Sequence, residues 1–452
     1  MSKISRRDFF GCTAAIGGSA LLASTPFLSS CSSSSSSKQT PLREPGSYYI
    51  PQLDDKAADG RELKVALVGC GGRGTGAALN ILTAANGIKI TAFADVFADK
   101  IDECLENLKK NGYEFPDAER FVGFDSYKGA IDSGVDIVLL TTPPVFRPYH
   151  FQYAVSKGVN CFLEKPVAVD AKGYRTVIAA AKQAASKKLA VVTGTQRHHH
   201  RGYVESFQKI QEGLMGRITG GNVYWNQCML WYRNREQGWS DMEWNIRDWV
   251  NWTWLSGDHI VEQHVHNIDV FMWMMGGAHP IKATGFGSRQ RRITGNQYDN
   301  FSVDFEFEGG VHLHSMCRQM NGCSDIVDEF IRGSKGWWSS QDFSIRDYDG
   351  NILWQYDEEA SKAKFAMHDP YVLEHVDLVN HVRSGQPLDQ ATETANSTLA
   401  GIMGRESAYT GKLMEWDAMV ALDQDLLPGE PDALTLGDLD CVKNLVIPVP
   451  GN

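Results

Sequence analysis

The clearest chemical pattern in the chain is a glycine-rich loop that follows an apolar run. Its residues are Gly69, Cys70, Gly71, Gly72, Arg73 and Gly74. Glycines at this spacing allow a tight turn and let the backbone approach a pyrophosphate at the start of a helix. Asp95, 21 residues after Gly74, can accept hydrogen bonds from an adenosine ribose and repels a 2′-phosphate. The pattern predicts a site for NAD, with NADP disfavoured.

A second group of titratable residues lies in the region 258–277, where apolar residues at helical spacing predict a helix. Glu262 and His266 are one turn apart on that helix. A carboxylate beside a histidine can orient the ring and tune its proton affinity, which suits general acid–base catalysis. An alternative stays open, because Glu262, His264 and His266 could gather a metal ion if the helix began later. We expect no metal there.

The order of apolar runs indicates which elements position these residues. From residue 63 to about 193, short apolar runs alternate with helical patterns, which is typical of a parallel sheet flanked by helices. The expected strands span residues 64–68, 88–93, 137–140, 159–163 and 189–192. Beyond this region, apolar and polar residues alternate as in antiparallel strands, and helices are expected at 371–382 and 392–409. The pattern predicts an α/β domain followed by an α+β domain.

An export leader precedes these domains. Arg6 and Arg7 stand before a weakly apolar stretch, residues 11–28, which matches a secretory signal better than a membrane span. The pair resembles a twin-arginine signal, which implies export of a folded protein; the alternative is an ordinary signal with two charges. Cys31 resembles a lipoprotein cleavage site with residues 32–37 as a serine tether, and a chance cysteine is the alternative. We expect a lipid-anchored protein in the periplasm or outer cell envelope.

Composition sets limits on the partners. The net charge is −11, and the sequence has no stripe of basic residues, so no nucleic-acid partner is expected. Nine cysteines form no CxxC pair, and we interpret those beyond the leader as buried free thiols. The expected divisions are a signal at 1–31, a tether and arm at 32–60, a nucleotide-binding domain at 61–193 and a substrate and oligomerisation domain at 194–452.

Further motifs, spread over nearly all of the chain after the tether, carry a family resemblance. They are Thr142-Pro143-Pro144, His150, Cys161-Phe162-Leu163-Glu164-Lys165-Pro166, Gln196-Arg197, the spaced set Glu262, His266 and Asp269, and Ser407-Ala408-Tyr409-Thr410-Gly411. Together they resemble the Gfo/Idh/MocA oxidoreductase family. The resemblance implies a Rossmann domain plus a domain with a large, open, mainly antiparallel sheet, and an active site between the two.

The resemblance also implies roles for individual residues. Lys165 would sit beside the nicotinamide and the reacting hydroxyl, a place that its position at the end of a parallel strand supports. His266 would be the proton shuttle, and Glu262 would replace a more frequent aspartate. Besides the glycine loop and Asp95, the expected cofactor contacts are Thr142, Pro143, His150, Glu164, Lys165, Gln196 and Arg197.

The substrate is expected to be a carbohydrate. Eight of the twelve tryptophans lie between Trp225 and Trp273, among many hydrogen-bonding residues. Aromatic faces beside polar groups suit the mixed surface of a sugar, although a tryptophan-rich core or subunit interface is the alternative. The expected substrate contacts are Trp239, Trp249, His264 and Asp269. The family resemblance also leads us to expect a homo-oligomer.

The expected location outside the cytoplasm bears on the choice between two mechanisms. A plain dehydrogenase passes hydride from a sugar hydroxyl carbon to NAD and must then exchange it, which is difficult outside the cytoplasm. Tightly bound NAD is therefore expected. The alternative enzyme oxidises a sugar hydroxyl, eliminates a substituent and reduces again, as the exported NAD-dependent α-N-acetylgalactosaminidases of the family do. A non-catalytic glycan-binding lipoprotein with a vestigial nucleotide fold is a further alternative.

Overall fold

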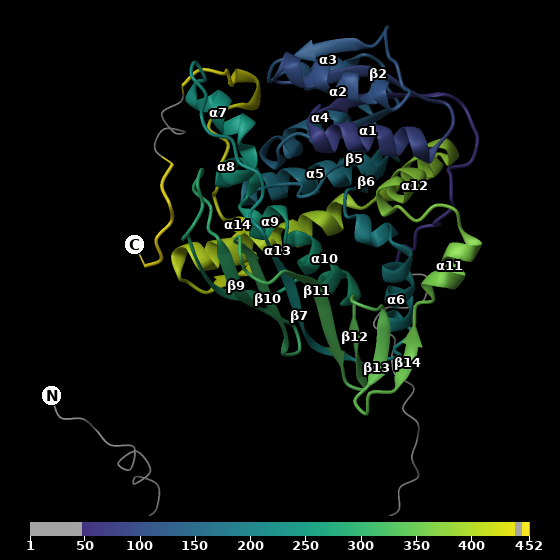
Figure 1. The fold of residues 1–452 in the computed structure, drawn as a ribbon, viewed down its shortest axis with the longest axis vertical. Helices are drawn as coiled ribbons and strands as arrows, with labels where there is room; N and C mark the ends of the chain where they lie inside the picture. The colour runs from purple at the N-terminus through teal and green to yellow at the C-terminus, as the bar shows by residue number, and fades with distance from the viewer. Residues whose placement is uncertain (1–47, 439–444, 452) are drawn as a thin grey trace, which may run out of the picture. The chain divides into compact units, whose positions relative to one another are not determined.

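A computed structural model describes residues 48–438 and 445–451 of the chain (Figure 1). The predicted signal, Cys31 and most of the arm lie outside the described residues. Within those residues, no helix combines the length and apolar composition that crossing a bilayer requires.

The first sheet has seven strands in the order β15-β6-β5-β4-β1-β2-β3, and all of them are parallel. Its strands are β1 (Leu63–Val68), β2 (Ile88–Asp95), β3 (Glu119–Val122), β4 (Ile137–Leu140), β5 (Asn160–Leu163), β6 (Ala190–Thr193) and β15 (Leu388–Asp389). The five predicted strands are confirmed. The edge strand β3 was missed because its residues are mostly exposed and half of them are charged, which hides a strand pattern.

Helices cover both faces of this sheet. They are α1 (Gly72–Ala84), α2 (Ala98–Lys110), α3 (Ser126–Asp132), α4 (Arg147–Lys157), α5 (Ala171–Ser186) and α12 (Pro370–Ser384). One apolar cluster joins Val65 and Leu67 of β1 to α1, α2 and α12, and another joins Ala66 and Val68 to α3, α4 and α5. Alternate strand residues therefore bury against opposite helix layers. Residues 370–389, which sequence patterns assign to the second domain, return to this layer as α12 and β15.

The second sheet has nine strands in the order β14-β13-β12-β11-β7-β10-β9-β8-β16. They are β7 (Ile218–Gln227), β8 (Lys282–Ser288), β9 (Asn300–Phe307), β10 (Val311–Gln319), β11 (Ile326–Gly333), β12 (Gly336–Ser339), β13 (Ser344–Asp347), β14 (Ile352–Gln355) and β16 (Met414–Glu415). Only β7 and β10 pair in parallel, so the predicted fold class, a Rossmann domain plus a domain with a mainly antiparallel sheet, is confirmed.

The remaining helices connect the two sheets. They are α6 (Arg201–Gln211), α7 (Asp241–Arg247), α8 (Thr253–Ser256), α9 (His259–Glu262), α10 (Val265–Met274), α11 (Glu358–Lys364), α13 (Ala391–Thr410) and α14 (Trp416–Ala421). Figure 1 shows α9, α10 and α13 between the first domain and the second sheet. Their apolar side chains pack on Phe305 and other inward residues of β9 and β10. The single helix predicted for 258–277 is wrong, because the chain breaks between α9 and α10.

The cysteines follow the prediction in part. Cys70, Cys104, Cys161 and Cys317 are buried free thiols, whereas Cys228 is exposed and Cys323 is half-buried. The exposed position of Cys228 corrects the prediction of burial. It lies directly after β7, where the chain leaves the sheet.

Candidate active site

The glycine loop between β1 and α1 has the backbone geometry that a dinucleotide needs. Gly69 has φ +96°, and a Cβ there would lie 2.7 Å from the backbone nitrogen of Thr142. A Cβ on Gly74 would lie 1.9 Å from the Gly69 carbonyl oxygen, so the turn and the helix pack without side chains. Around Gly71 and Gly72 an added Cβ meets nothing within 4 Å. The loop therefore leaves open space at the N-terminus of α1, where a phosphate binds well.

Asp95 ends β2 beside this loop. Its carboxylate accepts hydrogen bonds from the backbone nitrogens of Cys70 at 2.7 Å and Phe97 at 3.0 Å. Burial raises the pKa of Asp95. The carboxylate lines a cavity of about 400 Å³ together with Gly71, Gly72 and Arg73. These residues fit the adenosine half of a dinucleotide, with Asp95 at the ribose.

Gly74→Ala tests this packing. The new Cβ would meet a backbone oxygen that cannot turn away, so α1 must shift from β1. We expect the free energy of unfolding to fall by about 1–3 kcal/mol and nucleotide affinity to fall with it. Thermal unfolding with and without NAD measures both effects. Gly76→Ala is the matched control, because its Cβ meets only the end of the Arg73 side chain at 3.3 Å; equal behaviour of the two variants would refute the packing argument.

A second cavity of about 330 Å³ adjoins the first, and Arg73 and Trp249 line both. Its other lining residues are Pro144, Arg147, Glu164, Lys165, Gly194, Gln196, Trp225, Glu262, Gln263, His266 and Tyr371. They come from the segments after β4, β5 and β6, from β7, and from α9, α10 and α12 with the residue that follows α9. The three predicted catalytic residues, Lys165, Glu262 and His266, therefore lie around one space.

Lys165 follows β5, and its ammonium group reaches α9. The Nζ atom donates hydrogen bonds to the Glu262 backbone oxygen and, at 3.2 Å, to Glu262 Oε1. Both side chains are about nine-tenths buried. An ammonium group has three donors, so one remains for a ligand in the cavity.

His266 lies on α10 and stacks on Trp225 with ring centroids 5.6 Å apart. Burial and then the positive charges of Lys165 and Arg197 hold the pKa of His266 well below 6.5. The imidazole is therefore neutral near pH 7 and able to accept a proton. The prediction that Glu262 orients this ring is not met, because the Glu262 carboxylate bonds to Lys165 and Gln263 instead.

Arg147, which the sequence patterns did not single out, secures the strand ends beneath Lys165. Its guanidinium is buried and donates to the backbone oxygens of Leu140, Thr142 and Pro166. Burial lowers its pKa to about 10. Because the three oxygens belong to the last residue of β4 and to the segments after β4 and β5, Arg147 fixes the backbone that carries Lys165. The only local signal is its place at the start of a helix behind Thr142-Pro143-Pro144.

A carboxylate pair surrounds Arg73, and its second member, Glu374, was missed. The Arg73 guanidinium donates to Glu164 and lies 4.8 Å from the ring centre of Tyr371. Glu374 is fully buried 3.8 Å from the same guanidinium, and burial with the charge of Glu164 raises its pKa well above the usual range. Tyr371 and Glu374 belong to α12, which lies about 300 residues after the glycine loop in the sequence. No short motif could indicate this contact.

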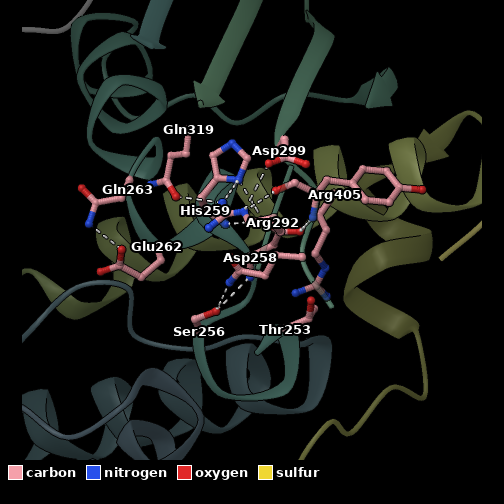
Figure 2. Close-up of polar contacts among 12 residues, drawn as sticks. Thr253, Ser256, Asp258, His259, Glu262, Gln263, Arg292, Asp299, Gln319 and Arg405 are labelled. Atoms are coloured by element: carbon pink, nitrogen blue, oxygen red, sulfur yellow. Dashed lines mark hydrogen bonds and ion pairs between the residues drawn. The ribbon is translucent and has the colours of Figure 1, made fainter. Parts of the chain in front are cut away.

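The short helix α9 is held by a buried polar network that Figure 2 shows beside Glu262. Asp258 has φ +71°, and its carboxylate accepts hydrogen bonds from the His259 and Tyr298 backbone nitrogens and from the Tyr409 hydroxyl. Arg292 donates to Gln319 within the same network. These bonds offset the unusual backbone of Asp258 and fix where α9 begins. They therefore fix Glu262 opposite Lys165.

Two of the predicted cofactor contacts, Arg197 and His150, lie behind the cavity, whereas Gln196 lines it. Arg197 is buried, donates to Glu329 and stands over Trp225, so its charge is held inside the second domain. His150 is buried under the loop, with Nδ1 3.3 Å from the Thr142 hydroxyl. Gln196 does line the cavity, and its amide donates to the Tyr371 hydroxyl at 3.2 Å. Arg197 and His150 therefore support the site from behind.

Three predicted substrate contacts are corrected as well. His264 is fully buried, with Nε2 2.7 Å from the Ser315 hydroxyl. Asp269 is bonded to His198 at 2.6 Å and to Ser397 at 2.6 Å, on the far side of α10. Trp239 lines neither cavity and packs against Arg247. Helical spacing placed Asp269 on a face shared with Glu262 and His266, and the break before α10 removes that face. Trp239 was expected from the tryptophan-rich stretch instead.

The metal alternative is not supported by the described residues. His264 points to β10 while Glu262 points to Lys165, so the three candidate ligands do not converge. In residues 48–438 and 445–451, no group of three or more histidine, cysteine, aspartate or glutamate residues is arranged to hold a metal ion.

Comparison with known proteins places the nucleotide-binding domain in a family. Residues 63–193 match the family described as "Oxidoreductase family, NAD-binding Rossmann fold", Gfo/Idh/MocA. The nucleotide-binding domain, residues 63–193, therefore belongs to this family. The family resemblance and the NAD-binding Rossmann domain predicted from sequence are thereby confirmed.

The relatives of the chain carry names of different activities. A "Glycosyl hydrolase family 109 protein" of Streptomyces coelicolor is 25% identical over 220 residues, 48% of this chain and 44% of that protein. An "Inositol 2-dehydrogenase/D-chiro-inositol 3-dehydrogenase" of Halalkalibacterium halodurans is 24% identical over 249 residues, 55% of this chain and 63% of that protein. The chain thus spans about half the length of the curated relatives it matches.

Solved structures share the fold over most of the chain. The scyllo-inositol dehydrogenase of Lactobacillus casei, with bound NAD(H) and scyllo-inositol, superposes with a TM-score of 0.59. The match covers 80% of this chain and 100% of that one, at 19% identity. This likeness supports the two-domain fold and leaves the substrate to be argued from the site.

Proposed function

We propose that the protein moves a hydride between a hydroxyl-bearing carbon of a sugar or polyol and NAD. The observation that carries the proposal is the shared wall of the two cavities: Lys165 and His266 face a space that adjoins the open glycine loop. When bound, NAD accepts the hydride. The residues of this chain have to supply the proton transfer and the positioning.

His266 transfers the proton, and Lys165 stabilises the charge on the oxygen that loses it. The neutral His266 imidazole accepts the proton of the substrate hydroxyl as the hydride leaves the adjacent carbon. The remaining donor of the Lys165 ammonium group stabilises negative charge that develops on the oxygen. Glu262 holds the ammonium group in place through Oε1 and its backbone oxygen. In the reverse direction His266 returns the proton.

The wall of the second cavity supports a carbohydrate as the substrate. Trp225 and Trp249 offer aromatic faces, while Gln263 and Tyr371 offer hydrogen-bonding groups. Such a mixture suits a ring with apolar C–H faces and a hydroxyl rim. The volume of about 330 Å³ is at the lower end for small-molecule sites, which favours a single sugar ring over an oligosaccharide.

A second function is favoured by the relative named as a glycosyl hydrolase. In this alternative the hydroxyl carbon is oxidised, a base removes a proton beside the new carbonyl, and the substituent leaves with its electron pair. Water then adds, and the hydride returns to the carbonyl carbon, so NAD ends unchanged. His266 lines the cavity, and its imidazole takes this second proton after it has passed the hydroxyl proton to solvent. A resident, tightly bound cofactor serves this cycle and suits the export that the leader predicts.

Location and assembly belong to the same proposal. The twin-arginine leader and the lipid anchor at Cys31 would place the enzyme in the periplasm or outer envelope, where NAD is scarce. Fractionation of cells and mass measurement of the mature N-terminus test both points.

Pairing of copies into a homo-oligomer, tested by light scattering, stays a prediction. A hollow of about 840 Å³ on the outer face of the second sheet is lined by none of the predicted site residues.

The deciding experiment uses the full chain purified from its native compartment. The protein is first denatured and the released nucleotide identified; NAD is expected. Intact protein is then mixed with inositols, free sugars and aryl glycosides while reduced nicotinamide and products are followed. Net NADH formation supports the dehydrogenase, and product without net NADH supports the redox-neutral cycle. Bound NAD with neither product would support the glycan-binding alternative and overturn the enzyme proposal.

A further inference from the structure

The first cavity has a wall that the nucleotide-binding domain does not supply. Five of its lining residues belong to the cover segment, defined as residues 228–251 between β7 and α8. They are Trp231, Arg233, Ile246, Arg247 and Trp249. On the opposite wall stand Asp95 and the glycine loop. The second domain therefore closes over the part of the site where the adenosine half of a dinucleotide belongs.

A bidentate ion pair ties the cover segment to the nucleotide-binding domain. Arg247 Nη1 and Nη2 lie 2.9 and 3.1 Å from the two carboxylate oxygens of Asp99, in the first turn of α2. The same guanidinium stacks 3.8 Å from the ring centre of Phe97 and bonds to Glu243 at 2.9 Å. A charge pair with this geometry is more specific and stronger than a single surface contact.

Apolar packing reinforces the tie. Met242 and Ile246 of α7 join Phe97, Val145 and Phe146 of the nucleotide-binding domain in one hydrophobic cluster. The C-terminal segment enters the same cluster through its own leucines, Leu427 and Leu434. In Figure 1 this yellow segment runs beside α7. The cover segment is therefore packed between two other parts of the chain.

The inner side of the cover segment presents groups suited to a nucleotide. Trp231 is 47% exposed, and its ring lies edge-on to Trp249 at 6.2 Å. Within the described residues, the Arg233 guanidinium has no carboxylate partner in ion-pair range. Hydrogen bonds fix the backbone around it: the Arg233 nitrogen donates to Asp248 at 2.7 Å, and its oxygen accepts from Trp244 at 2.8 Å. An open aromatic face and a free cation thus border the ribose-binding Asp95.

We propose that the cover segment is the outer wall of the adenosine site, with Trp231 and Arg233 binding the adenosine half of the dinucleotide. The proposal rests on the proposed function, since it takes NAD as the cofactor. The indole offers a stacking face, and the guanidinium offsets phosphate charge. Because the wall is tied down by Arg247 and the hydrophobic cluster, a bound dinucleotide leaves slowly. Slow release explains how the cofactor stays bound between turnovers.

Binding of cofactor fragments tests the assignment without relying on turnover. Calorimetry with ADP-ribose and with nicotinamide mononucleotide is carried out on the wild type, Trp231→Ala and Arg233→Ala. We expect ADP-ribose to bind about ten- to a hundredfold more weakly to both variants, because aromatic stacking and phosphate contacts are lost. Nicotinamide mononucleotide should bind with unchanged affinity. For Arg247→Met, NADH should dissociate about tenfold faster when displaced by excess NAD and followed by nicotinamide fluorescence.

Matched controls come from the outer face of the second sheet. Trp337→Ala and Arg332→Ala remove the same residue types from the hollow there, and ADP-ribose affinity should stay at the wild-type value. Unchanged ADP-ribose affinity in Trp231→Ala and Arg233→Ala would overturn the assignment while leaving the proposed function intact. A change in sugar binding alone would also overturn it and move the segment to the substrate side. A wild type that binds no NAD would sink the proposed function itself.

Discussion

Lys165→Met should lower kcat by about 10²- to 10⁴-fold while NAD stays bound. The ammonium group has a free donor and lines the second cavity with His266, so its loss removes both orientation and charge stabilisation at the reacting oxygen. Cofactor binding should persist, because the glycine loop and Asp95 are untouched. Steady-state rates on the substrate found in the glycoside and polyol panel, with released nucleotide counted per chain, measure the two effects separately.

The controls separate chemistry from stability. Lys165→Met leaves the Glu262 carboxylate about nine-tenths buried without its partner, which typically costs about 3–5 kcal/mol. Lys165→Met with Glu262→Gln should regain thermal stability yet remain inactive. Lys172→Met removes an exposed lysine that pairs with Asp425 and should leave kcat unchanged. Recovery of activity in the double variant would rule out Lys165 as the catalytic cation.

Local spacing was enough to predict the cofactor site. The glycine loop and Asp95 lie within one β-α-β unit, and Lys165 ends a nearby strand of the same sheet. In a parallel sheet the carboxyl ends of strands meet at one edge, so these residues had to come together. The same rule identified Glu164 beside Lys165.

The second half of the site depends on contacts that spacing cannot predict. Arg197 follows β6, which suggested a cofactor contact, yet Glu329 on β11 captures its guanidinium 132 residues away in sequence. Helical periodicity grouped Glu262 with Asp269, but the break between α9 and α10 sends them to different partners. A periodic pattern gives the face of a continuous helix and carries no information about where that helix is interrupted.

The sequence did not predict that the C-terminal helix α12 packs on the nucleotide-binding domain, for a related reason. Residues 371–382 were predicted as a helix, and α12 confirms this, but its packing against α1 follows from the topology of the whole sheet. Tyr371 and Glu374 reach the cavity only through that packing. The cover segment likewise depends on the C-terminal segment, whose leucines lie nearly 200 residues beyond α7. The tryptophans of the cover segment predicted a binding surface, but the sequence pattern did not show that this surface faces the nucleotide.

Acidification from pH 7 to pH 5 should destabilise the folded protein by several kcal/mol. Burial, aided by a neighbouring positive charge, lowers the pKa of His150, His264 and His375 to about 3 each. In the unfolded chain these rings titrate near about 6.5, so below that pH the unfolded state binds protons that the folded state excludes. Stability is therefore full above about pH 6.5 and declines on acidification, by about 2 kcal/mol per ring at pH 5.

The buried carboxyl of Glu374 acts in the opposite direction. Its pKa is raised in the folded protein, so its unfavourable contribution shrinks as the pH falls and cancels part of the histidine effect. His264→Gln tests the net argument, because an amide can keep the bond to Ser315 and does not titrate. Its loss of melting temperature between pH 7 and pH 5 should be smaller than that of the wild type. His312→Gln, at a ring 53% exposed, should follow the wild type, and identical pH dependence in all three proteins would contradict buried neutral histidines as the acid-sensitive groups.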